Sequence, residues 1–201
     1  TLDELAELAP IALALHEGEH PVPDTLRGAA RDLVDETVAR WATERQAVPP
    51  WTRDLTPIAN QTGLERLDLS GCAGISNLGP LRYLTQLERL DMRGCAAVAD
   101  LAPIAQLDKL QWADLRDCTA VEDLSPLGSL TALRWLDLGG CTTLTDLASL
   151  ANLDRLQALV LHGCTGLTDL TPLGAARSLR YLVLTDCTHV TDLGPLQVLP
   201  G

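Results

Sequence analysis

Six cysteines are the side chains with the greatest chemical potential in this sequence, and each follows the previous one by 23 residues. They are Cys72, Cys95, Cys118, Cys141, Cys164 and Cys187. Cysteines can form a disulfide framework in a small secreted protein, and clustered cysteines and histidines can hold zinc. One cysteine per interval gives no C-x-x-C pair, so a zinc site is not expected. The spacing favours a column of buried, reduced thiols, a form that persists best in the cytosol.

A second column, of short acidic or amide side chains, has the same spacing. It comprises Asn77, Asp100, Asp123, Asp146, Asp169 and Asp192. A ladder of acids suggests calcium, but the glycine- and aspartate-rich signatures of calcium-binding repeats are missing. We predict instead that these side chains cap turns, by accepting hydrogen bonds from free backbone N–H groups.

The sequence contains none of the common catalytic motifs. No serine lies in a G-x-S-x-G context, and neither a glycine-rich phosphate loop nor H-E-x-x-H is present. Of the four histidines, only His162 falls on the outward face of a predicted strand, and its neighbours there, Ala158 and Val160, offer no carboxylate to orient it. We therefore predict a protein that is not an enzyme and that uses neither a cofactor nor a metal ion.

Composition limits the classes of partner. The formal net charge is -12 and the pI is about 4.6, whereas non-specific binding to nucleic acid or to an anionic membrane favours a basic surface. No stretch approaches the ~20 apolar residues that span a bilayer, and no signal peptide is visible. The sequence starts with Thr rather than Met and stops at the end of a repeat, so we expect a piece of a longer protein. For such a piece a missing targeting signal says little. The acidic charge predicts a protein without nucleic-acid or membrane partners, and the reduced thiols favour a cytoplasmic location.

The element that must position these residues is a 23-residue repeat without insertions or deletions. Its first half, L-x-x-[LA]-x-[LM]-x-x-C, begins at Leu64, Leu87, Leu110, Leu133, Leu156 and Leu179. Apolar residues at its first, fourth and sixth positions alternate with more polar ones, as in a half-buried strand. The second half predicts a turn and a short helical or 3-10 segment, often with proline in its first turn. Repetition at this period indicates a solenoid, in which equivalent strands stack in parallel about 4.8 Å apart.

These repeats resemble the leucine-rich repeat family, L-x-x-L-x-L-x-x-[N/C]-x-L, over residues 64–201 in full and from residue 55 in part. The ending seen in Thr168-Asp169-Leu170-Thr171-Pro172-Leu173 is similar to the internalin-type class, and Cys in place of Asn is similar to cysteine-containing subtypes. The resemblance implies an α/β horseshoe with a parallel sheet on its concave face, short helical or 3-10 segments on its convex side, and typically a protein partner. Similar repeats follow a helical segment in bacterial NACHT-type nucleotide-binding leucine-rich-repeat receptors, a class of immune ATPase.

Residues 1–54 lack the full repeat and are predicted to be helical. The leucines from Leu2 to Leu15 fit one amphipathic helix, and Asp24 is a good N-cap for a second that extends to about Ala47. We interpret residues 1–54 as an N-terminal cap over the first coil or as the end of a preceding helical domain. Residues 55–201 are then the repeat domain, a half-repeat plus six repeats.

Three positions of each predicted strand share one outward face, because side chains alternate along a strand. The third position holds Arg66, Arg89, Trp112, Trp135, Ala158 and Tyr181. The fifth holds Asp68, Asp91, Asp114, Asp137, Val160 and Val183, and the seventh holds Ser70, Arg93, Arg116, Gly139, His162 and Thr185. Trp112 and Trp135 should be solvent-facing neighbours close to arginines, a composition typical of interface anchors. They could instead form a cross-strand pair that only stabilises the sheet, typically by ~0.5–1 kcal/mol.

Four aspartates in the fifth-position column repel one another unless their charge is compensated. The arginines of the neighbouring columns could neutralise them from within the sheet, or a partner could bring Arg or Lys into the groove.

These columns predict a recognition module that binds a protein or peptide on its concave face. The candidate binding residues are Arg66, Asp68, Arg89, Asp91, Arg93, Trp112, Asp114, Arg116, Trp135, Asp137, His162 and Tyr181. The narrower hypothesis is the ligand-sensing region of an immune-type nucleotide-binding receptor. The alternatives are a structural or autoinhibitory domain that contacts upstream domains of its own chain, and a secreted adhesin-like module.

Overall fold

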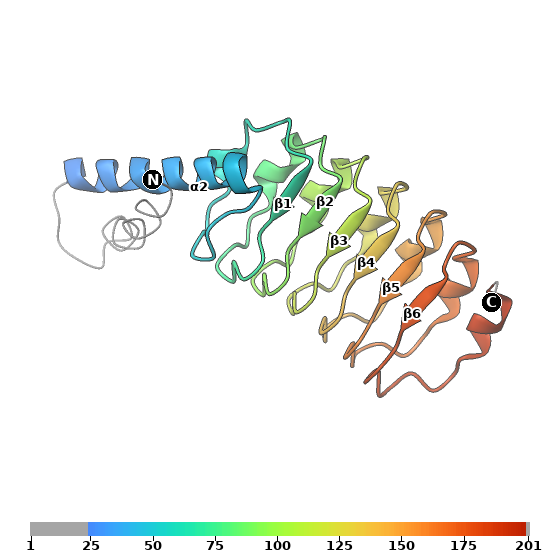
Figure 1. Cartoon of the computed structure of the whole chain (residues 1–201). Coiled ribbons are helices and arrows are strands. Elements are labelled where there is room, and N and C mark those ends of the chain that lie inside the picture. Colours follow the sequence, from blue (N-terminus) through green and yellow to red (C-terminus); the bar gives the residue numbers. More distant parts are fainter. Residues whose placement is uncertain (1–23, 200–201) are drawn as a thin grey trace.

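The chain forms a row of parallel coils that begins at one helix (Figure 1). The structure is a computed structural model that describes residues 24–199, with side chains described from residue 31. Helix α2 spans Asp24–Arg45. The strands are β1 (Arg66–Asp68), β2 (Arg89–Asp91), β3 (Trp112–Asp114), β4 (Trp135–Asp137), β5 (Ala158–Val160) and β6 (Tyr181–Val183). The 3-10 helices are η1 (Thr56–Ile58), η2 (Gly79–Tyr83), η3 (Ala102–Gln106), η4 (Ser125–Ser129), η5 (Ala148–Asn152), η6 (Thr171–Ala175) and η7 (Gly194–Val198). The predicted helix from Leu2 to Leu15 lies outside the described residues.

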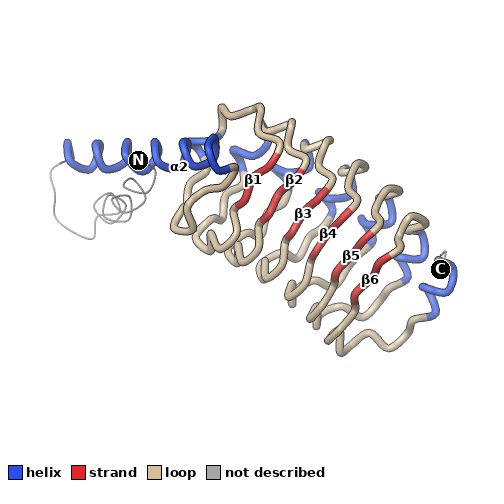
Figure 2. Tube along the Cα trace, in the orientation of Figure 1, coloured by secondary structure: helices blue, strands red, loops and turns tan. Residues whose placement is uncertain are grey.

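The strands form one parallel sheet in sequence order, β1-β2-β3-β4-β5-β6. Strand residues pair with the residue 23 positions later, as Arg66 does with Arg89 and Trp112 with Trp135. Figure 2 shows the strands along one side of the row and the 3-10 helices along the other. The predicted solenoid, with a parallel sheet and a short helical side opposite, is confirmed.

An aliphatic core runs between the sheet and the 3-10 helices. The first-position leucines from Leu87 to Leu156 are fully buried, and so are Leu136 and Leu138 at the fourth and sixth positions of one repeat. Burying one such side chain contributes roughly 1.5–3 kcal/mol. Because every coil repeats the same set, the core is distributed along the row rather than gathered at one centre.

Each coil leaves its strand through a residue with left-handed backbone conformation. These residues are Gly71, Gly94, Asp117, Gly140, Gly163 and Asp186, with φ from 58° to 77°. Most side chains destabilise this conformation by roughly 1–2 kcal/mol, whereas Gly adopts it freely and Asp tolerates it. This corner explains why only those two residue types occupy the eighth position of the repeat.

The predicted turn-capping column is confirmed. Oδ1 of Asp123 accepts a hydrogen bond from the backbone N–H of Ser125 at 2.8 Å, and Asp146 does the same for Ala148 at 2.7 Å. The equivalent bonds are made by Asn77, Asp100, Asp169 and Asp192. In each coil the side chain satisfies the first N–H group of the 3-10 helix, which has no partner within the helix itself.

The predicted thiol column is also confirmed, since all six cysteines are free and buried. The thiols from Cys95 to Cys187 each donate a hydrogen bond to a backbone carbonyl oxygen of the preceding coil, and the Cys72 thiol donates to the Pro49 oxygen. The distance is 3.3 Å from Cys95 Sγ to the Leu69 oxygen and 3.2 Å from Cys118 Sγ to the Met92 oxygen. Burial raises the pKa of Cys95 to about 12, so the thiol stays protonated and keeps its donor.

Helix α2 ends two residues before the predicted boundary near Ala47. Gln46 has a φ of 55°, which ends the helix, and Ala47 forms a parallel bridge with Asp68 of β1. The C-terminal turns of α2 pack on the first coil: Val38 is buried, and the Gln61 side chain donates a hydrogen bond to the Ala39 carbonyl at 2.7 Å. This packing is what a cap requires, while the division of the chain at residue 55 stays a prediction.

Within residues 24–199, no helix is both long and apolar enough to cross a lipid bilayer.

We predict that stability falls at alkaline pH because of the thiol column. Burial raises the pKa of Cys95 from 9.0 to about 12, so the folded state holds a proton that the unfolded state releases first. This stabilisation is complete below about pH 9 and is lost as the pH rises to about 12, by up to ~1.4 kcal/mol per pH unit for each thiol. Urea denaturation at several alkaline pH values measures the slope. The Cys95→Ala variant should have a shallower slope than the parent, and equal slopes would contradict the assignment.

Candidate functional site

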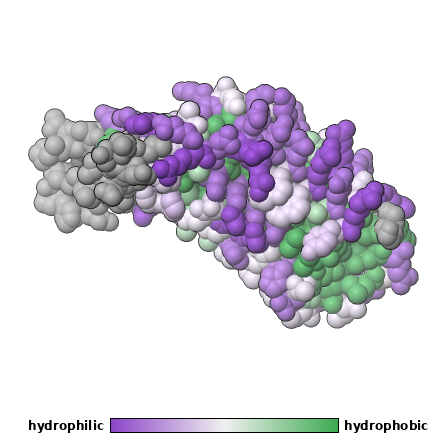
Figure 3. Space-filling model, in the orientation of Figure 1, coloured by the Kyte–Doolittle hydropathy of each residue, from purple (hydrophilic) through white to green (hydrophobic). Residues whose placement is uncertain are grey.

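The outward surface of the sheet, called the strand face below, carries the three predicted columns. The strand register places third-position residues beside one another, from Arg66 on β1 to Tyr181 on β6. The fifth-position residues, from Asp68 to Val183, pair in the same way. Figure 3 shows hydrophilic surface over the coils of β1 to β4, and a more hydrophobic area at the C-terminal end of the row. The face therefore changes character along the solenoid.

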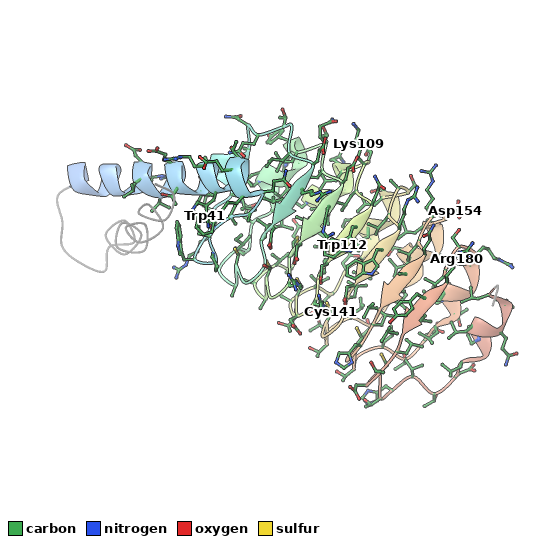
Figure 4. The ribbon with its side chains drawn as sticks, viewed as in Figure 1. Trp41, Lys109, Trp112, Cys141, Asp154 and Arg180 are labelled. Atoms are coloured by element: carbon green, nitrogen blue, oxygen red, sulfur yellow. The ribbon has the colours of Figure 1, made fainter. Side chains whose placement is uncertain are left out.

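Arg89, Trp112 and Trp135 form one continuous stack across β2, β3 and β4. The two indole rings have centroids 4.4 Å apart and lie within 4° of parallel. Cζ of Arg89 lies 3.7 Å from the centre of the Trp112 ring, within the range of a cation–π contact. Figure 4 labels Trp112 on the sheet. The predicted neighbour relationship is confirmed, and the rings are half-buried rather than fully exposed.

Two arginines neutralise three aspartates beside this stack. Nε of Arg93 lies 2.9 and 3.0 Å from the two carboxylate oxygens of Asp91, and 3.6 Å from Asp114. Arg116 lies 2.7 Å from Asp114 through its Nη2 atom and 3.1 Å from Asp137 through its Nε atom. Opposite charges therefore alternate diagonally from β2 to β4.

The aspartates of this network are covered from solvent. Asp91, Asp114 and Asp137 are 8%, 0% and 4% exposed. Each also accepts a hydrogen bond from the backbone N–H two residues later, as Asp137 does from Gly139 at 2.8 Å. Of the two alternatives for the acidic column, internal neutralisation describes these three residues. A partner would meet the arginines that cover them before it met the carboxylates.

Burial raises the pKa of Asp137, while the hydrogen bond from Gly139 and the nearby Arg116 partly oppose the shift. Because the folded-state pKa is raised, the neutral carboxyl of Asp137 stabilises the fold at low pH. This stabilisation is lost as the pH rises above 3.8, the ordinary pKa of the group, and through the raised folded-state pKa. Ionisation of Asp137 therefore costs stability, and Arg116 limits that cost. The hydrogen bonds to Asp91 and Asp114 raise the pKa of Arg93 and Arg116.

A pocket of about 320 Å³ opens at the N-terminal end of the strand face, where α2 meets β1 and β2. We call it the arginine pocket, and it is lined by Arg45, Gln46, Arg66, Leu67, Asp68, Arg89, Asp91 and Arg93. Four guanidinium groups thus face two carboxylates, one of which is already bound by Arg93. Within the described part of the chain, the side chains of Arg66 and Arg89 form no ion pair, contrary to the suggestion that they neutralise the aspartates. The pocket concentrates positive charge on a protein of net charge -12.

His162 and Tyr181 lie toward the other end of the strand face. Nδ1 of His162 is 2.9 Å from Oγ1 of Thr185 and 3.5 Å from a carboxylate oxygen of Asp186. Tyr181 is 58% exposed. Across residues 24–199 no group of three or more His, Cys, Asp or Glu side chains is arranged to hold a metal ion.

Two contributions to this surface escaped the sequence analysis. Arg45 and Gln46 line the arginine pocket although they precede the first repeat. The Asp68 N–H donates to the Gln46 carbonyl at 2.7 Å, which attaches this segment to the edge of the sheet, and no repeat pattern indicates that bond. The carboxylate of Asp186 beside His162 could have been found, because the 23-residue register places Thr185 next to His162.

Comparison with known proteins supports the fold. No protein-family model matches the chain, and neither does any curated protein. Among solved structures, an internalin C2 from Listeria monocytogenes is 29% identical with a TM-score of 0.62, over 74% of this chain and 63% of the internalin. A leucine-rich-repeat protein from Leptospira interrogans is 20% identical with a TM-score of 0.54, over 66% of this chain and 34% of that protein. The chain therefore spans only part of the length of either relative.

The 23-residue register and these likenesses identify the fold as a leucine-rich-repeat solenoid with an internalin-like, cysteine-containing repeat. The expected fold class is confirmed.

We predict that Arg116→Ala lowers the free energy of unfolding by about 2 kcal/mol, because it leaves Asp137 buried without its cation and Asp114 with only Arg93 at 3.6 Å. Urea denaturation measures the loss. The matched control is Arg134→Ala, an exposed arginine outside the network, which should change stability by less than about 0.5 kcal/mol. Adding Asp114→Asn to the Arg116→Ala variant should restore part of the loss. Equal effects of the two alanine variants would show that the network does not stabilise the fold.

Proposed function

We propose that this solenoid is a non-enzymatic recognition module that binds a protein or peptide on its strand face. The observation that carries the proposal is the stack of Arg89, Trp112 and Trp135 on an open sheet, in which Arg89 is exposed and the two indole rings are half-buried. Trp and Arg side chains contribute most of the affinity at many interfaces, because they bury large surfaces against a partner. The solenoid fold, shared with internalin C2, adds support, since stacked repeats provide extended surfaces for binding.

The charges of the strand face also favour binding over a purely structural role. The aspartates of β2 to β4 have their arginine partners within the sheet. Arg66 and Arg89, in contrast, are exposed cations that no described carboxylate pairs. Such side chains are available to a partner at little desolvation cost, and they guide an oppositely charged surface toward the face.

A second candidate is a structural or autoinhibitory contact with upstream domains of the same chain. It is favoured by helix α2, most of which projects away from the coils in Figure 1. Leu33 and Val34 on this helix are only half-buried, so they could pack against another domain. Under this alternative the upstream domains would compete with any separate ligand for the solenoid.

The narrower form of the proposal is the ligand-sensing region of a bacterial NACHT-type receptor in the cytoplasm. Its support is a helix that leads directly into the repeats, together with six free thiols that suit a reducing compartment. A nucleotide-binding ATPase domain upstream in the full-length sequence would favour this form. A secretion signal with a wall anchor would favour an adhesin-like module.

The test of the proposed function is a peptide-display selection on the purified protein, followed by affinity measurements with the selected peptides. Replacing Trp112 and Trp135 together by Ala should weaken binding by more than tenfold, because the variant loses the largest apolar contacts of the face. Circular dichroism and urea denaturation should show that the variant stays folded, since the core leucines are untouched.

The matched control removes exposed aromatic surface from the opposite side. Tyr83 lies on η2 and is 56% exposed, so Tyr83→Ala should leave the affinity unchanged. Selected peptides that bind the double tryptophan variant as tightly as the parent would overturn the assignment of the strand face.

A further inference from the structure

The aromatic column of the strand face is interrupted at β5. Trp135 pairs in register with Ala158, and Ala158 pairs with Tyr181. The side of Trp135 toward β3 is occupied by Trp112, with ring centroids 4.4 Å apart. On the side toward β5 its register partner is Ala158, whose side chain is a methyl group. The column therefore lacks one side chain between two aromatic residues.

The gap matches the thickness of one flat ring. Adjacent strands lie about 4.8 Å apart, so β4 and β6 are separated by about 9.6 Å at the backbone. Trp112 shows that a ring on each strand stacks at 4.4 Å from the next. A ring from a partner, placed above Ala158, could therefore contact Trp135 on one side and the exposed Tyr181 on the other. Such stacked aromatic pairs add to the affinity gained from buried area.

The surroundings of the gap suit an aromatic ring better than a cation. The fifth-position column changes from Asp137 on β4 to Val160 and Val183 on β5 and β6. Asp137, the nearest acid in that column, already has Arg116 at 3.1 Å. A guanidinium group above Ala158 would find no carboxylate in the fifth-position column of β5 or β6, whereas a ring would cover the apolar surface of Val160 and Val183.

The other end of the same face has the opposite character. The arginine pocket is lined by Arg66 and Arg89, which have no carboxylate partner among the described residues, and by Arg45 and Arg93. Guanidinium groups bind carboxylates through two parallel hydrogen bonds, so this pocket suits an acidic side chain. The Arg89 side chain is held against Trp112, which reduces the freedom lost when it binds.

We propose that the partner of the strand face is an extended peptide segment that places an acidic side chain in the arginine pocket and an aromatic ring over Ala158. This inference rests on the proposed function and names the chemistry of its partner. The two sites are three strands apart, from β2 to β5, or about 14 Å. An extended chain covers that distance with about four residues, so the acid and the ring are separated by about four positions.

The probe is a synthetic peptide with two glutamates and one tryptophan separated by about three Gly or Ser residues, so that acid and ring are about four positions apart, prepared in both orders. Four comparison peptides are used: one replaces Glu by Lys, one replaces Trp by Gly, one replaces Trp by Arg, and one shortens the spacer. NMR titration of the protein measures each affinity and follows the indole N–H signals. One order of the spaced peptide should bind at least tenfold more tightly than every comparison peptide. The Trp135 signal should shift, while that of Trp51, which does not line the arginine pocket, should not.

Two variants of the protein assign the two ends of the peptide. Ala158→Trp fills the gap with a ring from the protein itself. The affinity of this variant for the spaced peptide should fall to that of the Trp-free peptide, while its affinity for the Trp-free peptide should equal that of the parent. Arg66→Gln should weaken every Glu-containing peptide and make binding less sensitive to salt. The matched control is Arg82→Gln, on η2 at the opposite side, which should change neither.

The outcomes separate this inference from the proposed function. If Ala158→Trp binds the spaced peptide as tightly as the parent does, no ring occupies the gap. The pocket takes no acid if two results are found together: Arg66→Gln binds the Glu peptide as tightly as the parent does, and the parent binds the Lys peptide as tightly as the Glu peptide. Either result overturns the inference, while peptides from the display selection that depend on Trp112 and Trp135 would still support the proposed function.

If no peptide depends on those tryptophans, both proposals fail together. An Arg peptide that binds best would assign the gap to a cation and overturn the aromatic assignment.

Discussion

The main-chain hydrogen bonds between successive strands are the constraint on which the rest of this structure depends. They pair each strand residue with the residue 23 positions later, from β1 to β6. Every side-chain column follows from that register. Leucines meet leucines in the core, each thiol meets a carbonyl oxygen of the coil before it, and Trp112 meets Trp135 ring to ring. A residue type that packs well against its own kind stabilises the fold in every coil that carries it. A residue type that repels its own kind destabilises the fold in every such coil.

Charge is where this constraint is most demanding. Identical acids at one position would lie about 5 Å apart in a stack of strands, which is destabilising. Arginines two residues after the aspartates offset this repulsion, because each pairs with the aspartate of its own coil and with that of the next coil. Arg116, for example, forms ion pairs with both Asp114 and Asp137. The fifth-position column changes from aspartate to valine between Asp137 on β4 and Val160 on β5, and Asp137 is the last aspartate that these arginines pair. The part of the face that the sheet does not use for its own neutralisation, and that we propose for recognition, is therefore the aromatic stack together with Arg66 and Arg89.

The repeat determined most of the fold in advance, because one register predicts all six coils together. The strands, the thiol column, the turn-capping side chains and the contact between Trp112 and Trp135 follow from spacing alone. The role of the aspartates did not, because alternation shows that Asp114 points outward but not that Arg116 folds over it and leaves it fully buried. The arginine pocket could not be predicted either, since Arg45 and Gln46 belong to no repeat and reach β1 through a helix end that follows its own geometry. What sequence periodicity omits is thus side-chain conformation across columns and everything that lies before the first coil.

The strand spacing also limits how much of a partner's sequence such a sheet can distinguish. The coils present one residue per column about every 4.8 Å, whereas same-face side chains of an extended peptide recur about every 6.8 Å. Two same-face steps of the peptide, about 13.6 Å, nearly equal three strand spacings, about 14.4 Å, which is the separation of β2 and β5. A peptide that crosses the strands is therefore read at a few widely spaced points, and its intervening residues are free to vary. In the proposed binding mode, specificity would depend on the distance between two features of the peptide rather than on a continuous sequence.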